Sequence, residues 1–138
     1  MNENSNIFTN RKILIYGLGK SGISSFKFLR RKNQVFLFDD NNKINLISNY
    51  KKSLISLNQI KKFKFDLIIL SPGINDKKCK LKKFLKKNSK IIYTDLDIFN
   101  SFYNNICITI TGTNGKSTTC QLLYKKQYTI KKLYQLKI

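Results

Sequence analysis

The sequence has no histidine, few acidic residues and only three cysteines, and these shortages narrow the chemistry that it can perform. Without an imidazole, the chain cannot use histidine for acid–base catalysis or for metal ligation. Cys79, Cys107 and Cys120 are scattered and lack CxxC spacing, which argues against a zinc site or a disulfide framework. We therefore expect three ordinary thiols.

Long apolar runs and a secretory signal are lacking as well. No apolar run approaches the ~18 residues that a membrane-spanning helix needs. The first residues, MNENSNIFTNRK, show no basic-then-apolar signal pattern. We therefore expect a cytoplasmic protein with no membrane partner. The 138 residues suffice for one well-buried domain and are too few for two complete ones.

The scarcity of acidic residues leaves a net charge of +20, which by itself suggests a nucleic-acid-binding protein. Nearly all the positive charges are lysines spread along the chain, and asparagine, isoleucine, phenylalanine and tyrosine are abundant too. All five residue types have A/T-rich codons, so a biased genome composition accounts for their common enrichment. We therefore expect no nucleic-acid partner. The alternative, a basic nucleic-acid-binding protein, predicts salt-sensitive binding to oligonucleotides.

Short apolar runs alternate with segments of helical periodicity along most of the chain. Strands are expected at residues 12–16, 34–38, 66–70, 90–93 and 106–110, and helices at 20–32, 78–87 and 96–102, with a further short helix and a short strand within 41–65. This alternation is typical of parallel βαβ units. We predict an α/β fold in which a Rossmann-like open parallel sheet carries helices on both faces. A soft boundary separates a first domain, 1–104, from a strand, loop and helix that begin a second domain, 105–138.

A first glycine loop, GLGKSG at residues 17–22, follows the first expected strand and opens a helix. In a G-x-G-x-x-G sequence the first glycine makes a tight turn, the second lets a ligand approach the backbone, and the third lets the helix pack closely. Asp39 and Asp40 end the next strand, where an acidic residue usually contacts a ribose or base. The alternative is a loop that only tightens a turn.

A second glycine loop, TGTNGKST at residues 111–118, resembles a phosphate-binding loop. The strict phosphate-loop pattern fails, because Ile110 stands where its first glycine is required. In the shorter form that remains, Lys116 would reach the β- and γ-phosphates of a nucleotide and the Ser117 hydroxyl would hold Mg²⁺. A helix beginning near Ser117 would add its N-terminal dipole. The alternative is a Gly-Asn turn followed by a Ser/Thr helix cap.

A third turn, SPGI at residues 71–74, follows the expected strand 66–70. Open α/β sheets bind ligands beyond the carboxyl ends of their strands, so this turn is a candidate ligand contact. The alternative is an ordinary turn with no ligand.

These three features, in this order, resemble the Mur ligases of peptidoglycan synthesis. The segments that carry the resemblance are KILIYGLGKSGISSFKFL, FLFDDN, DLIILSPGI, IIYTDLDIF and ITITGTNGKSTT, which extend from residue 12 to residue 119. Within the family, Asn114 and the first glycine loop fit the branch that adds D-glutamate to UDP-N-acetylmuramoyl-L-alanine. The family usually has threonine or a similar residue where Asp40 stands here.

The resemblance implies an ATP-dependent ligase of three domains, whose first domain holds a UDP-sugar rather than NAD. ATP would phosphorylate the carboxylate of UDP-N-acetylmuramoyl-L-alanine, and the amine of D-glutamate would attack the acyl phosphate. The resemblance assigns the UDP-sugar to Gly17, Gly19, Lys20, Ser21, Gly22, Asp39, Asp40 and Gly73, and ATP to Gly112, Thr113, Asn114, Gly115, Lys116, Ser117 and Thr118. Lys116 would be the catalytic residue, stabilising charge on the transferred phosphoryl group, and Ser117 would be the Mg²⁺ ligand.

The resemblance covers only about the first quarter of such an enzyme. From residue 124 onward, YKKQYTIKKLYQLKI lacks the small residues expected there. We therefore expect a truncated or frameshifted reading frame that is inactive as a ligase by itself. The alternative function is a stand-alone Rossmann nucleotide-binding module or an NAD-dependent oxidoreductase, which leaves the second glycine loop unexplained.

Overall fold

The computed structural model describes residues 6–41, 50–103 and 108–135, and the chain divides into two compact units, Met1–Asn104 and Asn105–Ile138. In the first unit, four parallel strands form a sheet: β1 (Lys12–Tyr16), β2 (Gln34–Phe38), β3 (Leu67–Leu70) and β4 (Ile92–Tyr93). Their order across the sheet is β2-β1-β3-β4. An isolated parallel bridge between Leu37 and Leu54 lies on the outer side of β2.

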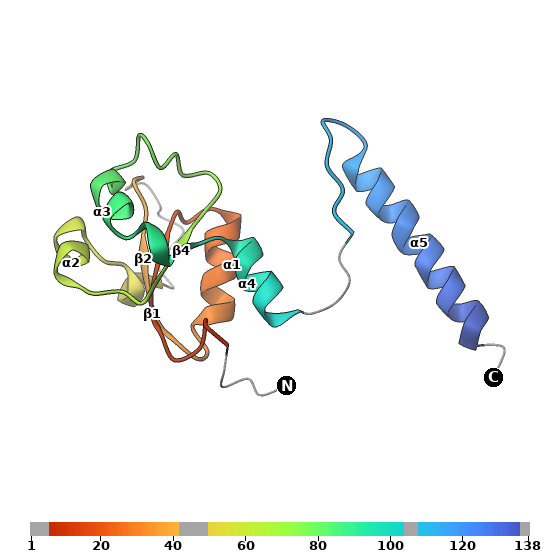
Figure 1. Ribbon diagram of the computed structural model, residues 1–138, viewed down its shortest axis with the longest axis horizontal. Coiled ribbons are helices and arrows are strands. Elements are labelled where there is room, and N and C mark those ends of the chain that lie inside the picture. The colour runs from red at the N-terminus through yellow and green to blue at the C-terminus, as the bar shows by residue number, and fades with distance from the viewer. Residues whose placement is uncertain (1–5, 42–49, 104–107, 136–138) are drawn as a thin grey trace. The chain divides into compact units, whose positions relative to one another are not determined.

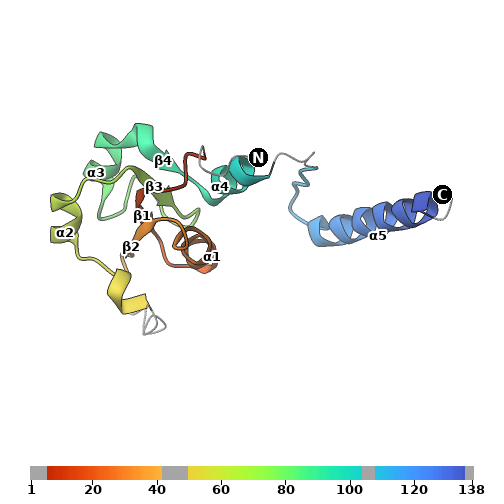
Figure 2. The same ribbon diagram turned by 90° about the horizontal axis from the view of Figure 1, so that it is seen from below.

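Among the described residues of this unit, four α-helices cover the two faces of the sheet: α1 (Lys20–Leu29), α2 (Leu57–Lys62), α3 (Lys82–Lys87) and α4 (Asp95–Phe102). Helices α1 and α4 lie on one side of the sheet, and α2 and α3 lie on the other (Figures 1 and 2). Side chains alternate between the two faces along a strand, and both faces of β1 are apolar. Ile13 and Ile15 join one core cluster, whereas Leu14 and Tyr16 join the other. The predicted α/β fold with helices on both faces is confirmed.

The strands predicted at 12–16 and 34–38 form with those bounds, and four other elements are shorter than predicted, among them β3, which begins at Leu67 rather than at residue 66. Helix α1 ends at Leu29, where the Asn33 side-chain amide donates to the Leu29 carbonyl. The 3-10 turn Ser89–Ile91 replaces the start of the strand predicted at 90–93, and turns precede α3. Within 41–65 the short helix is α2, and residues 42–49 lie outside the described residues.

Two of the short helices begin with capping boxes. The Ser56 and Gln59 side chains cap α2, and those of Thr94 and Asp97 cap α4. Each box satisfies backbone N–H groups that would otherwise lack partners at the helix start. The caps therefore help to explain why helices of six and eight residues form at these positions.

The described part of the second unit, residues 108–135, consists of a loop and one helix, α5 (Lys116–Gln135). The predicted helix after the second glycine loop is confirmed, but residues 108–110 of the strand predicted at 106–110 are not paired with another strand. Residues 106 and 107 lie outside the described residues. A β-strand needs a neighbour for its backbone hydrogen bonds, and Ile108 instead has 64% of its surface exposed.

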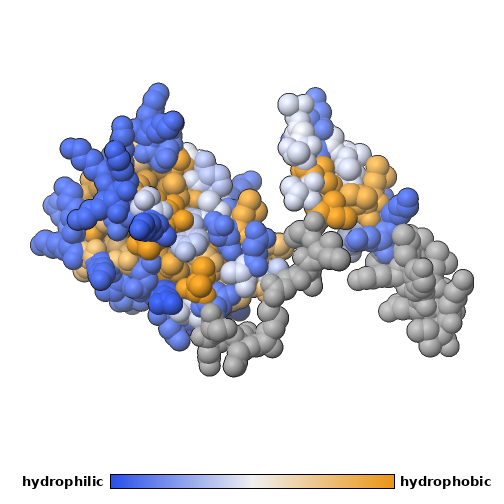
Figure 3. Space-filling view, in the orientation of Figure 1, coloured by the Kyte–Doolittle hydropathy of each residue, from blue (hydrophilic) through white to orange (hydrophobic). Residues whose placement is uncertain are grey.

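Lysine side chains lie on the surface of the first unit. Lys51, Lys52, Lys61, Lys62 and Lys82 are all exposed. Figure 3 shows hydrophilic side chains spread over the visible face of this unit, with apolar areas between them. In the part of the chain that the structure describes, no helix is long and apolar enough to cross a membrane.

Candidate functional site

The loops after β1 and β3 meet where the strand order reverses. From β1 the chain crosses to β2 on one side of it, and from β2 it returns to β3 on the other side. Ligands of open α/β sheets bind in the crevice at such a switch point. Here the Ser71 hydroxyl donates to the Gly17 carbonyl at 2.7 Å, and the Ser71 N–H donates to the Tyr16 carbonyl at 3.0 Å. The first glycine loop and the SPGI turn are therefore joined directly.

Two glycines of the first loop are required by packing. Gly17 has φ +97°, and a Cβ there would lie 2.7 Å from Ser71 Cβ. A Cβ on Gly22 would lie 1.8 Å from the Gly17 carbonyl oxygen, so only glycine lets α1 pack this closely against the loop. At Gly19, by contrast, an added Cβ would meet no atom within 4 Å. The backbone at Gly19 therefore faces open space that a ligand can enter.

Helix α1 begins beside this space. It has no side-chain cap and no acidic residue in its first turn. The first N–H groups of a helix have no partner within the helix and carry partial positive charge, which favours an anion. Lys20 is the first helical residue, and the Ser21 hydroxyl donates to an oxygen of Asp95 in α4.

Asp39 holds the first glycine loop in place. One of its carboxylate oxygens accepts from the Leu18 N–H at 2.6 Å, and the other accepts from the Asn41 N–H at 2.8 Å. These bonds connect the end of β2 to the loop after β1. A carboxylate oxygen has two lone pairs, so Asp39 can accept further hydrogen bonds from a ligand.

Asp40 lies between the side chains of Tyr16 and Lys80, neither of which was predicted to be a site residue. The buried Tyr16 hydroxyl donates to Asp40 Oδ1 at 2.6 Å. Lys80 donates to Asp40 twice, from its N–H to Oδ2 at 3.2 Å and from Nζ to the Asp40 carbonyl at 2.7 Å. Burial, and then the hydrogen bond to Asp40, raise the pKa of Tyr16 far above its ordinary value. Asp40 therefore connects β1, β2 and the segment before α3.

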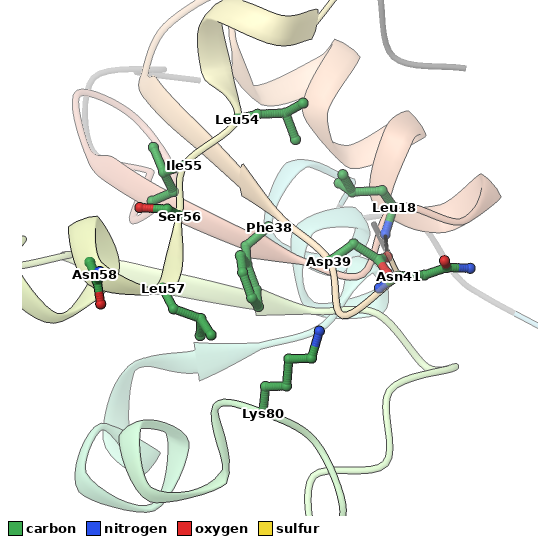
Figure 4. Close-up of a pocket in the computed structure, with 10 residues that line it drawn as sticks. All are labelled: Leu18, Phe38, Asp39, Asn41, Leu54, Ile55, Ser56, Leu57, Asn58 and Lys80. Carbon is green, nitrogen blue, oxygen red and sulfur yellow. Dashed lines mark hydrogen bonds between the residues drawn. The ribbon is translucent and has the colours of Figure 1, made fainter. Parts of the chain in front are cut away.

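A pocket of about 480 Å³ opens beside Asp39 and Lys80 (Figure 4). Its lining consists of Leu18, Phe38, Asp39, Asn41, Leu54, Ile55, Ser56, Leu57, Asn58 and Lys80. One side is apolar, and Asp39, Asn41 and Lys80 supply polar groups. The sequence did not identify residues 54–58 as site residues, because that segment has weak periodicity. It did not identify Lys80 either, because Lys80 is one of many similar lysines.

The structure does not bring every predicted site residue to this pocket. Lys20 and Ser21 line a second pocket of about 380 Å³, together with Asp95 and residues of α4. Gly73 lines neither of these pockets, and an added Cβ there would meet no atom within 4 Å. Of the predicted UDP-sugar residues, Asp39 therefore lines the first pocket, Lys20 and Ser21 line the second, and the glycines and Asp40 line neither.

The second glycine loop belongs to the other unit and is exposed throughout. Gly112 and Gly115 have φ +148° and +78°, which favours glycine. The Lys116 ammonium donates to the Gly112 carbonyl, and to the Thr113 carbonyl at 3.3 Å. The first intrahelical bond of α5 runs from the Thr119 N–H to the Gly115 carbonyl at 2.9 Å. The earlier N–H groups of this helix, including that of Ser117, lack intrahelical acceptors.

These groups suit a phosphate better than a bare metal ion. Backbone N–H groups and an ammonium all attract phosphate oxygens. Among the described residues, no group of three or more His, Cys, Asp or Glu side chains is placed to hold a metal. The exposed Ser117 hydroxyl can serve as one oxygen ligand, and Mg²⁺ commonly takes its remaining ligands from phosphates and water. These groups can therefore accept a phosphate, with the Ser117 hydroxyl available as one Mg²⁺ ligand.

Comparisons with known proteins give a consistent result. Residues 11–93 match the family model "Mur ligase MurD-like, N-terminal domain". The chain is 38% identical over 120 residues to "UDP-N-acetylmuramoylalanine--D-glutamate ligase" from Buchnera aphidicola subsp. Schizaphis graminum, covering 83% of this chain and 27% of that protein. The protein of the same name from Rickettsia conorii is 36% identical over 122 residues, covering 86% of this chain and 24% of its own length.

A third protein of that name, from Clostridioides difficile, is 35% identical over 124 residues, covering 82% of this chain and 27% of its own length. The chain thus spans about a quarter of the length of the curated relatives that it matches. No solved structure matches the chain.

Proposed function

The chain belongs to the MurD-like branch of the Mur ligases, as its N-terminal domain, and from this we propose that its first unit binds the uridine diphosphate of UDP-N-acetylmuramoyl-L-alanine. The observation that carries the proposal is the pocket beside Asp39, which borders the first glycine loop within a domain of this family. In the proposal, residues 1–104 form the UDP-sugar-binding domain. The family match favours this function over an NAD-dependent oxidoreductase.

The geometry supports a specific arrangement of the ligand. The uridine occupies the pocket, with its polar groups facing Asp39. The diphosphate lies over Gly19, where the backbone is open, and against the first turn of α1. Lys20 adds positive charge and Ser21, fixed by Asp95, shapes the floor. Gly17 and Gly22 act through packing, and Gly73 leaves room at the SPGI turn.

For the second unit, residues 105–138, we propose that the loop from Gly112 to Thr118 binds ATP. Thr113, Asn114 and Gly115 form the turn around the phosphates. Lys116 turns from the Gly112 and Thr113 carbonyls to the β- and γ-phosphates, because a phosphate carries full negative charge and a carbonyl does not. Ser117 holds Mg²⁺ through its hydroxyl.

Together, the two units serve an ATP-dependent ligation of D-glutamate to UDP-N-acetylmuramoyl-L-alanine in peptidoglycan synthesis. Bound ATP supplies the phosphoryl group that activates the carboxylate of the UDP-sugar as an acyl phosphate. Asp39, Gly19 and the start of α1 position the nucleotide part of the substrate. Lys116 stabilises the charge of the transferred group.

Saturation-transfer NMR on the chain tests the first part of this proposal. UDP-N-acetylmuramoyl-L-alanine and NAD are compared at equal concentrations. We expect saturation of the uracil and ribose protons of the UDP-sugar and none of the nicotinamide or adenine protons. Saturation of NAD alone would refute UDP-sugar binding and support the oxidoreductase alternative.

A further inference from the structure

Lys80 is exposed like many lysines of the first unit, but its side chain is held in a fixed position. Its backbone N–H and its ammonium both donate to Asp40, which is itself held by the buried Tyr16 hydroxyl. A lysine side chain normally samples many rotamers, and anchoring both ends of it reduces that freedom before any ligand binds. Lys80 is therefore preorganised.

The anchored ammonium lies at the wall of the pocket that holds Asp39. Figure 4 shows the Lys80 side chain extending toward the turn formed by Asp39 and Asn41. An ammonium has three N–H donors, and one of them is used by the Asp40 carbonyl at 2.7 Å. The others can serve a ligand. The pocket thus combines a donor-only group with an acceptor-only group, the Asp39 carboxylate.

This pair of groups distinguishes between pyrimidine bases. The pairing edge of uracil offers an N3–H donor next to the O4 acceptor. Cytosine offers the reverse, an N3 acceptor next to the N4 amino donor. A carboxylate can accept from the uracil N3–H and an ammonium can donate to O4, whereas cytosine bound in the same orientation would place an acceptor against the carboxylate and a donor against the ammonium. The remaining walls, including Phe38, Leu54 and Leu57, are apolar and suit the faces of a base.

We propose that Lys80, anchored by Asp40, is a specificity-determining residue that donates to O4 of the uracil and selects uridine over cytidine nucleotides. The inference rests on the proposed binding of uridine diphosphate to the first unit. It also assigns a role to Asp40, which acts as a positioning residue through Lys80 rather than as a ligand contact.

The test measures dissociation constants of UDP and CDP for the whole chain by isothermal titration calorimetry, in wild type and in Lys80→Met. Hydrogen bonds to charged groups contribute enough that we expect UDP to bind about tenfold more weakly to Lys80→Met, with CDP nearly unchanged. The preference for UDP over CDP then falls by the same factor. Lys82→Met is the matched control, because Lys82 is an exposed neighbour that does not line the pocket.

Each other outcome has a definite meaning. Equal weakening of UDP and CDP would overturn the proposal and indicate that Lys80 contacts phosphate. Unchanged affinity for both ligands, or the same change in Lys82→Met, would also overturn it. Absence of UDP binding to the wild type would instead refute the proposed function. Lys80→Gln, whose amide still donates, serves as the second variant and is expected to lose less of the preference than Lys80→Met.

Discussion

Replacing Gly22 by alanine probes the close approach of α1 to the first glycine loop. The new Cβ would lie 1.8 Å from the Gly17 carbonyl oxygen and 2.9 Å from Ser71 Oγ. Since the nearer atom belongs to the backbone, no side-chain rotation relieves the contact. Helix α1 must move away from the loop, and the Ser71 hydrogen bond to Gly17 is strained with it.

The expected loss of stability in Gly22→Ala is the difference between two opposing contributions. Overpacking costs about 1–3 kcal/mol, and the upper end applies here because the backbone has to shift. Alanine has the higher helix propensity, which offsets about 1 kcal/mol. We therefore expect the free energy of unfolding to fall by about 2 kcal/mol in a urea titration. For a unit of this size, the melting temperature then falls by roughly 10 °C.

Gly19→Ala is the matched control. An added Cβ at Gly19 meets no atom within 4 Å, and the backbone there is extended, with φ −69° and ψ −171°. Its stability should stay within about 0.5 kcal/mol of wild type, while UDP binds more weakly because the methyl group enters the proposed diphosphate site. A Gly22→Ala protein as stable as wild type, with an unchanged urea dependence, would refute the packing argument.

Three further predictions each address a single side chain. Ser71→Ala should lower the free energy of unfolding by about 1–2 kcal/mol in urea titration, because it removes the buried bond to the Gly17 carbonyl; no loss would contradict this role. The pKa of Tyr16 is raised in the folded protein, whereas in the unfolded chain it has its ordinary value of about 10. Above about pH 10 only the unfolded chain releases the tyrosine proton, so the folded protein loses stability as the pH rises further; below about pH 10 the contribution of Tyr16 is complete. Tyr16→Phe should therefore reduce the decline in stability above about pH 10, and an unchanged decline would be evidence against the effect. Lys116→Met should weaken ATP binding at least tenfold by fluorescence titration, with stability within about 0.5 kcal/mol because Lys116 is exposed; unchanged ATP affinity would count against the phosphate-loop proposal.

The sequence by itself determined the framework of the first unit. The runs KILIY and QVFLF became β1 and β2 with the predicted bounds, because unbroken apolar runs suit strands buried on both faces. The glycine spacing of the first loop also predicted its turn and its close contact with α1, since each of these excludes a Cβ. Family membership followed from the order of the three motifs.

The strand predicted at 106–110 shows the limit of local patterns. Its residues are apolar and suited to a strand, yet residues 108–110 are unpaired. Strand formation depends on a neighbouring strand, which no local pattern supplies.

Only the tertiary structure decided the candidate site. Tyr16, Asp40 and Lys80 are far apart in the chain, and they meet because β1 and β2 are neighbours whose carboxyl ends face the segment before α3. From the sequence alone, Tyr16 is predicted to be a core residue and Lys80 a surface lysine, and only the strand order shows that both contact Asp40. The hydrogen bonds that fix Asp39 likewise depend on where the loop after β1 lies. Residue type and spacing determine local structure, but the pairing of donors with acceptors across a site is decided by how the strands are ordered in the sheet.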